Sequence, residues 1–444
     1  MIKNKNKLSS ELHICVLAPP FFSHLRPMLQ LASEMREKNV QVTVACAPQF
    51  KEVILKARCR FAEIYINRNS NIGSASETEQ VEEEKQRLNE FFDASKKGAV
   101  ETLAIQMRHR RQDMFANPDE VMNSIIRLQR TLQPDLWVID QLSYSVTISM
   151  SVLELPFFTF CPPHPATIPQ NGRAYGMPIC WPKFLLPSRD KLAELEAYAR
   201  SAEKEFDTAA NEFLKTRGYP NAKLTHTFSL SSTRAVIFNY PDFGGKTESD
   251  APNRIYMGYS FSREILDDKW ASILKVKEKK IYIGLGTFLA KRTDVLRKLI
   301  IGLRELFPSA LLIAAAGSSW SALRSLADDR TLVESFLPQK AILPFVDCVV
   351  HHGGVGSFTE ALYFGKPAVV LPFSSDQFNV ACDVEQQGLG VVLDPNSFTA
   401  SDLQAAMQKI EDGAFHESLL RWSRHIRERG PAYAADAVLD LIDS

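Results

Sequence analysis

Short apolar runs recur along the first half of the chain, and the segments between them carry apolar residues every three or four positions. Residues 12–18 form the first run and residues 40–45 the second. The apolar positions between the two runs have helical spacing: Leu25, Met28, Leu29, Ala32 and Met35. This order predicts a β-α-β unit with buried parallel strands. Further runs at 136–139, 157–160 and 235–238 predict that the same sheet continues.

A second series of strands and helices begins at Lys280 with IYIGLGTF and continues through runs at 311–316, 346–350 and 368–371. A segment rich in Pro, Gly and Asp separates the two series, which is typical of a linker. A chain of 444 residues also exceeds one ordinary core. We therefore predict two doubly wound α/β domains, over residues 1–240 and 254–425, with a linker at 241–253 and a C-terminal helix in 426–444.

Composition and charge exclude several classes of protein. Lys+Arg and Asp+Glu are both 52, so no basic excess points to nucleic acid. The N-terminus has lysines but no apolar core of a signal peptide, and no run reaches the ~18 apolar residues of a membrane span. The seven cysteines are scattered without a CxxC pair. This pattern predicts reduced thiols in a cytoplasmic protein.

A candidate anion site follows the apolar run at 346–350. The sequence HHGGVGS over residues 351–357 leads into a helical pattern, so a strand, a glycine-rich turn and a helix start come together. Helix starts carry unpaired N–H groups and positive potential, which suit a phosphate. Glu360, in what we expect to be the first turn, is placed to meet ribose hydroxyls. Asp376 and Gln377 follow the next strand, and the strand ends of such a sheet share one crevice.

This stretch resembles the donor-binding segment of family 1 UDP-glycosyltransferases. The resemblance implies the GT-B fold, two Rossmann-like domains facing a central cleft, with an N-terminal acceptor domain, a C-terminal nucleotide-sugar domain and a last helix that crosses back. It places Phe336 where the family has a base-stacking Trp, and Leu337 and Gln339 beside base and ribose. The diphosphate positions are Thr287, His352, Gly354, Gly356 and Ser357. Glu360 matches the ribose carboxylate, and Asp376 with Gln377 matches the pair that holds the sugar.

The candidate catalytic residues are His24 and Asp140. His24 lies between the first apolar run and the first helix, in FxSHLRPMLQLA, which is similar to the family's GHxxPxxxLA segment whose His is the base. A helix start would help keep the imidazole neutral. Asp140 ends the run at 136–139, on the same sheet edge, where a carboxylate orients a base. A packing role for His24 and an N-cap role for Asp140 are the alternatives.

The acceptor pocket is less defined by sequence. A proline-rich loop from 162 to 187 and nearby segments hold aromatic residues that suit an apolar pocket: Phe21, Phe22, Phe91, Phe92, Tyr144, Tyr175, Trp181 and Phe184. His164 in this loop is a weaker candidate for a second acid or base. The basic cluster at residues 108–111 is interpreted as a solvated face, ahead of contact with an anionic membrane.

Gly284 and Gly286 also fit the first two glycines of the dinucleotide-binding motif of dehydrogenases. However, Leu289 replaces the third glycine of that motif, and no acidic residue ends the next strand. We therefore predict an inverting hexosyltransferase that moves a sugar from a UDP-sugar, with UDP-glucose as first choice, to a lipophilic hydroxyl acceptor. No DxD motif occurs, so no metal and no other cofactor is expected. A glycosyltransferase acting on a membrane lipid and a silent nucleotide-sugar-binding protein are the alternatives.

Overall fold

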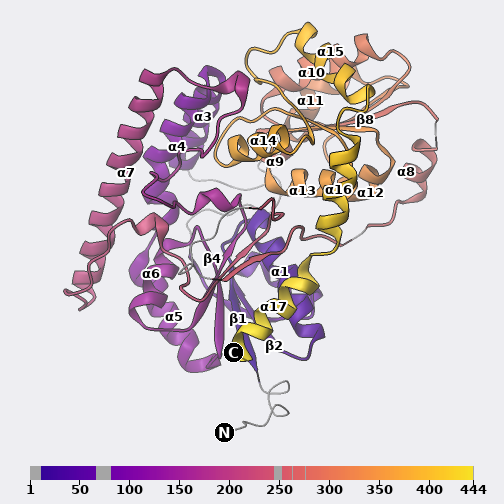
Figure 1. Ribbon diagram of the computed structural model, residues 1–444. Helices are drawn as coiled ribbons and strands as arrows, with labels where there is room; N and C mark the ends of the chain where they lie inside the picture. Colours follow the sequence, from indigo (N-terminus) through magenta and orange to yellow (C-terminus); the bar gives the residue numbers. More distant parts are fainter. Residues whose placement is uncertain (1–11, 67–81, 245–252, 263, 276, 444) are drawn as a thin grey trace.

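The computed structural model describes residues 12–66, 82–244, 253–262, 264–275 and 277–443, and these form two α/β domains (Figure 1). The first domain is built on a parallel seven-stranded sheet of order β3-β2-β1-β4-β5-β6-β7. The strands are β1 (His13–Leu17), β2 (Gln41–Cys46), β3 (Arg60–Glu63), β4 (Leu136–Asp140), β5 (Phe157–Cys161), β6 (Ala235–Phe238) and β7 (Asn253–Tyr256). The apolar runs predicted β1, β2, β4, β5 and β6 correctly, because strands covered on both faces have continuous apolar sequences.

Helices cover both faces of this sheet, and three of them stand beside the second domain (Figure 1). They are α1 (Phe22–Glu37), α2 (Lys51–Lys56), α3 (Glu82–Lys97), α4 (Ala99–Met114), α5 (Pro118–Leu132), α6 (Tyr144–Val152) and α7 (Arg189–Thr216). α4 packs on both α3 and α7, and α4 and α7 share a cluster around Leu103, Met107 and Leu195, whereas Phe91 and Phe92 of α3 are buried against the core of the second domain. They form the wall that meets the second domain.

The second domain has a parallel six-stranded sheet of order β10-β9-β8-β11-β12-β13. Its strands are β8 (Lys280–Gly284), β9 (Leu311–Ala315), β10 (Thr331–Glu334), β11 (Cys348–His351), β12 (Ala368–Val370) and β13 (Gly390–Val392). Its helices are α8 (Asp268–Ile273), α9 (Gly286–Leu289), α10 (Thr293–Leu306), α11 (Trp320–Leu323), α12 (Gln339–Ile342), α13 (Val355–Tyr363), α14 (Gln377–Gln386) and α15 (Ala400–Glu411). Both sheets share the strand order of a Rossmann fold, which confirms the predicted fold class.

The chain ends with α16 (His416–Arg427) and α17 (Pro431–Asp443). α16 packs on α13 of the second domain, whereas α17 packs on α1 of the first (Figure 1). Ala434, Ala435 and Val438 are fully buried in the core of the first domain. An ion pair between Lys38 and Asp436 joins α17 to the C-terminal end of α1. The last helix therefore ties the two domains together.

The boundary between the domains differs from the prediction. β7 pairs in parallel with β6, from Ala235 opposite Asn253 to Phe238 opposite Tyr256. Residues 253–256 thus belong to the first sheet, although the sequence placed the boundary before them. A single short strand at a sheet edge has too few apolar positions to be told from a linker by pattern. Most of the predicted linker, residues 245–252, lies outside the described residues.

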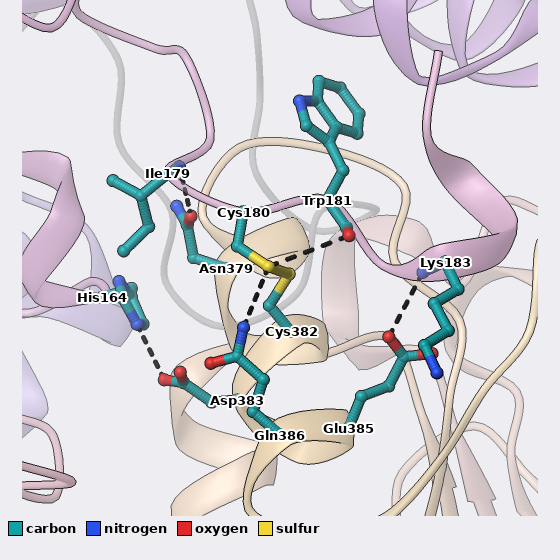
Figure 2. Close-up of a disulfide and its surroundings, with 10 residues drawn as sticks. All are labelled: His164, Ile179, Cys180, Trp181, Lys183, Asn379, Cys382, Asp383, Glu385 and Gln386. Carbon is teal, nitrogen blue, oxygen red and sulfur yellow. Dashed lines mark hydrogen bonds and ion pairs between the residues drawn. A yellow bond between two sulfur atoms is a disulfide. The ribbon is translucent and has the colours of Figure 1, made fainter.

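A disulfide also joins the domains, and the prediction of seven reduced thiols is wrong here. Cys180, in the loop from 162 to 187, is bonded to Cys382 on α14, with their Cα atoms 6.1 Å apart (Figure 2). The other five cysteines are free and buried. The two partners are separated by 202 positions in the sequence, so spacing gives no sign of the pair.

Candidate active site

His24 and Asp140 meet at the point where the strand order of the first sheet reverses. β1 and β4 are parallel neighbours, so the chain leaves both strands at the same edge of the sheet. His24 lies in the first turn of α1, which follows β1, and Asp140 is the last residue of β4. Nδ1 of His24 is 2.8 Å from Oδ2 of Asp140, and Oδ1 of Asp140 accepts the N–H of Leu142 at 2.8 Å. The expected proximity of the two residues is therefore found.

The environment of this pair favours a charged imidazole. Burial by itself favours neutral His24, but the charge and hydrogen bond of Asp140, joined by the charge of Asp376, raise its pKa above the ordinary value. The expectation that the helix start keeps His24 neutral is thus reversed by two carboxylates. A raised pKa makes the neutral imidazole a stronger proton acceptor. Asp140 does not cap α6, whose N-cap is Ser143, so that alternative is not supported.

His352 lies at the corresponding point of the second sheet. It follows β11, whose parallel neighbour β8 leads into Gly286. The His352 ring is enclosed by glycines: a Cβ on Gly354 would collide with its Nε2, and a Cβ on Gly286 would come 2.8 Å from its Cε1. Gly286 also has a positive φ of 73°. The glycines of this motif therefore make room for the imidazole at the start of α13.

The start of α13 has the properties of an anion site without a cationic side chain. Burial lowers the pKa of His352 to about 4, so its ring is neutral at pH 7 and donates one N–H. The helix begins at Val355 with no side-chain cap, which leaves its first N–H groups free for a ligand. A Cβ on Gly356 would meet open space, so Gly356, unlike Gly354, is not sterically required. Ser357, half-buried, is in the same turn.

Glu360 lies in the second turn of α13, one turn later than expected. Its carboxylate accepts Nε2–H of Gln339 at 2.6 Å, and Oε1 of Gln339 accepts the hydroxyl of Tyr282 at 2.9 Å. Burial raises the pKa of Glu360 to about 7. Glu360 and Gln339 are thus neighbours, as the ribose assignment requires, and Tyr282 is a partner that sequence reasoning missed.

The predicted base-binding residues differ in accessibility. Phe336 is 81% exposed, so its ring is free to meet a ligand. Leu337 is buried in the core beneath it, and its side chain is not available to a base. The backbone of Thr287 lies in α9, but its side chain is outside the part of the chain that the structure describes. Its assignment to the diphosphate stays a prediction.

The side-chain amide of Gln377 forms hydrogen bonds within its own loop. It is buried, and its Oε1 accepts the N–H groups of Phe373 at 2.9 Å and Ser374 at 3.2 Å. Its Nε2 donates to Oγ of Ser374. The amide therefore shapes the turn before α14, which counts against the predicted contact with sugar hydroxyls. Asp376, the residue before it, accepts the main-chain N–H of His164 from the other domain at 3.0 Å.

His164 joins the domains and is not free for acid–base chemistry. Its Nδ1 accepts the N–H of Ala166, and its Nε2 lies 2.9 Å from Oδ2 of Asp383 on α14 (Figure 2). The hydroxyl of Tyr240 donates to the same carboxylate oxygen at 2.8 Å. Both ring nitrogens of His164 are thus occupied, and the weak candidacy as a second acid or base is not supported.

The predicted acceptor aromatics are mostly structural. Tyr144 is core, Phe91 and Phe92 pack against Phe288 of the second domain, and Trp181 lies on Phe378. Phe21, Phe22 and Phe184 lie outside the pocket next to Asp376. Tyr175 alone of the set lines that pocket, which is partly open to solvent. It lies between α4, the loop from 162 to 187 and the start of α14.

The basic cluster at 108–111 does not form one face. Arg108 donates to the hydroxyl of Tyr198, His109 bonds to Glu90, and Arg110 turns toward the pocket. The side chain of Arg111 is outside the described residues. Within the described ranges, no helix is both long and apolar enough to cross a membrane. In the same ranges no His, Cys, Asp and Glu side chains gather in a group that could hold a metal ion.

Comparisons with known proteins agree with this geometry. Residues 307–429 match the model of the erythromycin biosynthesis protein CIII-like C-terminal domain. The uncharacterised UDP-glucosyltransferase YojK of Bacillus subtilis is 19% identical over 433 residues, which cover 97% of each protein. The glycosyltransferase of kitacinnamycin has a TM-score of 0.68 at 20% identity, covering 98% of this chain and 100% of that one.

A second similar solved structure contains a bound nucleotide. SsfS6, a glycosyltransferase of Streptomyces sp. SF2575 complexed with thymidine diphosphate, has a TM-score of 0.59 at 17% identity, covering 97% of this chain and 100% of its own. Similarity thus extends over both domains, and the matched family model covers much of the domain that holds the anion site. The chain therefore has the GT-B fold, and over nearly its whole length it is similar in sequence and structure to glycosyltransferases.

Proposed function

We propose that the protein transfers a sugar, with inversion, from a UDP-sugar to a hydroxyl of a lipophilic small molecule. The observation that carries the proposal is the His24–Asp140 pair, which Asp376 of the other domain approaches closely enough to raise the pKa of His24. A base that faces the sugar-binding loop across the domain boundary suits attack from the acceptor side of the sugar ring.

The proposed reaction follows from which ring nitrogen of His24 is free to accept a proton. Nδ1 of His24 is bonded to Asp140, so Nε2 takes the proton of the acceptor hydroxyl. The acceptor oxygen forms a bond to the anomeric carbon while the bond from that carbon to the β-phosphate oxygen breaks. Asp140 stabilises the imidazolium. The start of α13 and the neutral ring of His352 donate hydrogen bonds to the departing diphosphate.

The donor is proposed to be UDP-glucose. YojK is named as a UDP-glucosyltransferase, and SsfS6 was solved with thymidine diphosphate. Because the Phe336 ring is exposed and smaller than an indole, we expect dTDP-sugars to be tolerated as well. Transfer is expected to persist in excess EDTA, since the chain has no DxD motif. A loss of activity that added Mg²⁺ or Mn²⁺ restores would contradict this expectation.

The test is transfer from UDP-glucose to a panel of hydroxylated acceptors, followed by mass spectrometry, with the anomeric configuration of the product read by NMR. The variant His24→Ala should lose ~10²–10⁴-fold in rate. Its affinity for UDP, measured by calorimetry, should stay near that of the wild type, because the UDP contacts belong to the other domain. Ser23→Ala, at the exposed neighbouring position, is the control. Turnover by His24→Ala within a few-fold of wild type would exclude His24 as the base.

A further inference from the structure

The pocket beside Asp376 has a composition that goes beyond a lipophilic acceptor. Leu103 and Met107 of α4, with Tyr175 and Met177 of the loop, supply its apolar walls. Ser375, Asp376 and Asn379 close it from the second domain. Asp376 connects it to the catalytic pair, because its charge reaches His24. Given the proposed function, this is the space next to the reacting hydroxyl.

Most polar groups of this pocket are already occupied by the protein. Arg173 donates to the main-chain oxygens of Met177, Ala166 and Ile168. Oε1 of Gln106 accepts the N–H of Ser375, and Oδ1 of Asn379 accepts the N–H of Ile179. Asp376 accepts the N–H of His164. These residues hold the walls in place and have few groups left for a ligand.

Arg110 is the exception. Its guanidinium lies 5.6 Å over the Tyr175 ring, and its one hydrogen bond to the described residues is a long contact of 3.5 Å from Nη2 to Oγ of Ser375. Nε is buried and has no hydrogen-bond partner in the part of the chain that the structure describes. Among the described residues, no carboxylate lies within 4.0 Å of it, although Asp376 lines the same pocket. Its neighbour His109 on α4 does have one, Glu90 at 3.2 Å.

A guanidinium in a partly buried wall without a counterion is unfavourable unless a ligand supplies the negative charge. The planar fork of Arg fits a carboxylate through two parallel hydrogen bonds. We propose that the acceptor is a lipophilic hydroxyl compound that also carries a carboxylate, and that Arg110 binds this carboxylate. The apolar walls then hold the scaffold, with the hydroxyl directed to His24. This inference rests on the proposed function and names its substrate class.

The test uses matched acceptors that differ only in charge. Hydroxylated aromatic acids, such as 4-hydroxycinnamic acid and hydroxyflavone carboxylic acids, are compared with their methyl esters. Binding to the UDP-loaded protein is measured by calorimetry and transfer to the hydroxyl by mass spectrometry. We expect the acid of at least one pair to bind and react in preference to its ester. If no pair shows this preference, including the case in which neither member binds, the proposal is wrong.

Variants assign the preference to Arg110. In Arg110→Met the preference for the acid should fall by roughly 10- to 100-fold, the value of a charged hydrogen bond. Arg110→Lys keeps the positive charge but loses the planar fork of the guanidinium. Its preference for the acid should therefore lie between those of the wild type and Arg110→Met. Arg108→Met, two positions away and bonded to Tyr198, should keep the wild-type preference. Equal preference in wild type and Arg110→Met would overturn the proposal.

These experiments distinguish the proposed glycosyltransferase function from the proposed carboxylate-binding role of Arg110. Transfer to neutral acceptors with no preference for acids would leave the glycosyltransferase function standing and remove the role of Arg110. Preferential binding of acids without transfer to any acceptor would support the anion-binding role of Arg110 and contradict the proposed reaction.

Discussion

Nδ1 of His24 lies 2.8 Å from Oδ2 of Asp140, although 116 positions separate the two residues in the chain. Strand order explains this proximity: β1 and β4 are neighbours in the sheet, although α1 to α5, β2 and β3 lie between them in the described chain. The carboxylate is completely buried and has a second fixed donor in the Leu142 N–H. It can therefore hold the imidazole in one orientation.

The first prediction concerns the pH dependence of transfer. His24 must be neutral to accept a proton, and its pKa is raised, so the rate should fall as the pH drops through a value above 6.5. Asp140→Asn removes the charge that raises this pKa. The acid limb of the kcat/KM profile should then move to lower pH, while the maximal rate falls because the imidazolium is less stabilised. An unmoved acid limb in Asp140→Asn would mean that another group titrates.

The second prediction concerns Glu360 and the donor. Its pKa of about 7 means that it ionises near neutral pH, and ribose hydroxyls bind better to a carboxylate than to a carboxylic acid. UDP-glucose affinity should therefore weaken as the pH falls from 8 to 6, by about tenfold at most if only the carboxylate binds. UDP-glucose suits this measurement because its esterified diphosphate does not titrate in that range.

Glu360→Gln is the matched variant for this measurement. Its UDP-glucose affinity should be weaker than that of the wild type at pH 8 and flat across the same range. Calorimetry at three pH values measures both properties. A pH dependence that persists in Glu360→Gln would assign the titration to another group.

The third prediction concerns Gln377. Because its amide bonds to the main chain of Phe373 and Ser374, Gln377→Ala should destabilise the loop by about 1–3 kcal/mol. It should weaken UDP and UDP-glucose binding equally, if at all, and lower transfer through the displaced Asp376. Thermal unfolding and calorimetry with both ligands measure these effects. A loss confined to UDP-glucose would show instead that Gln377 contacts the sugar.

The fourth prediction concerns the bond between Cys180 and Cys382. Peptide mapping without reductant should recover the two residues in one linked peptide. Cys382→Ser should lower the free energy of unfolding by about 2–4 kcal/mol, because the freed loop gains entropy when the chain unfolds. Dithiothreitol should lower the stability of the wild type and leave that of Cys382→Ser unchanged. A reductant effect of equal size on both proteins would contradict this assignment.

The sequence by itself determined most strands of the two sheets and predicted where a ligand would bind. Strands buried on both faces must be apolar throughout, so runs such as 136–139 and 346–350 are visible without any knowledge of their partners. A helix that starts after a glycine-rich turn can bind an anion through its own backbone, which is why His352 and Gly354 could be predicted as anion-binding residues from local sequence. His24 and Asp140 followed because Asp140 ends β4 and His24 lies in the first turn of the helix that follows the neighbouring parallel strand β1.

The tertiary structure decided what each polar group does. Gln377, His164 and Arg110 look alike in sequence as polar residues near the expected site. Only their contacts show that the first two are occupied by the protein while Arg110 has no acidic partner among the described residues. The Cys180–Cys382 bond and the pairing of β7 likewise depend on segments that meet only after both domains have formed. Hydrogen bonds and disulfides require contact in space, and a linear pattern carries no record of contact between residues some 200 positions apart.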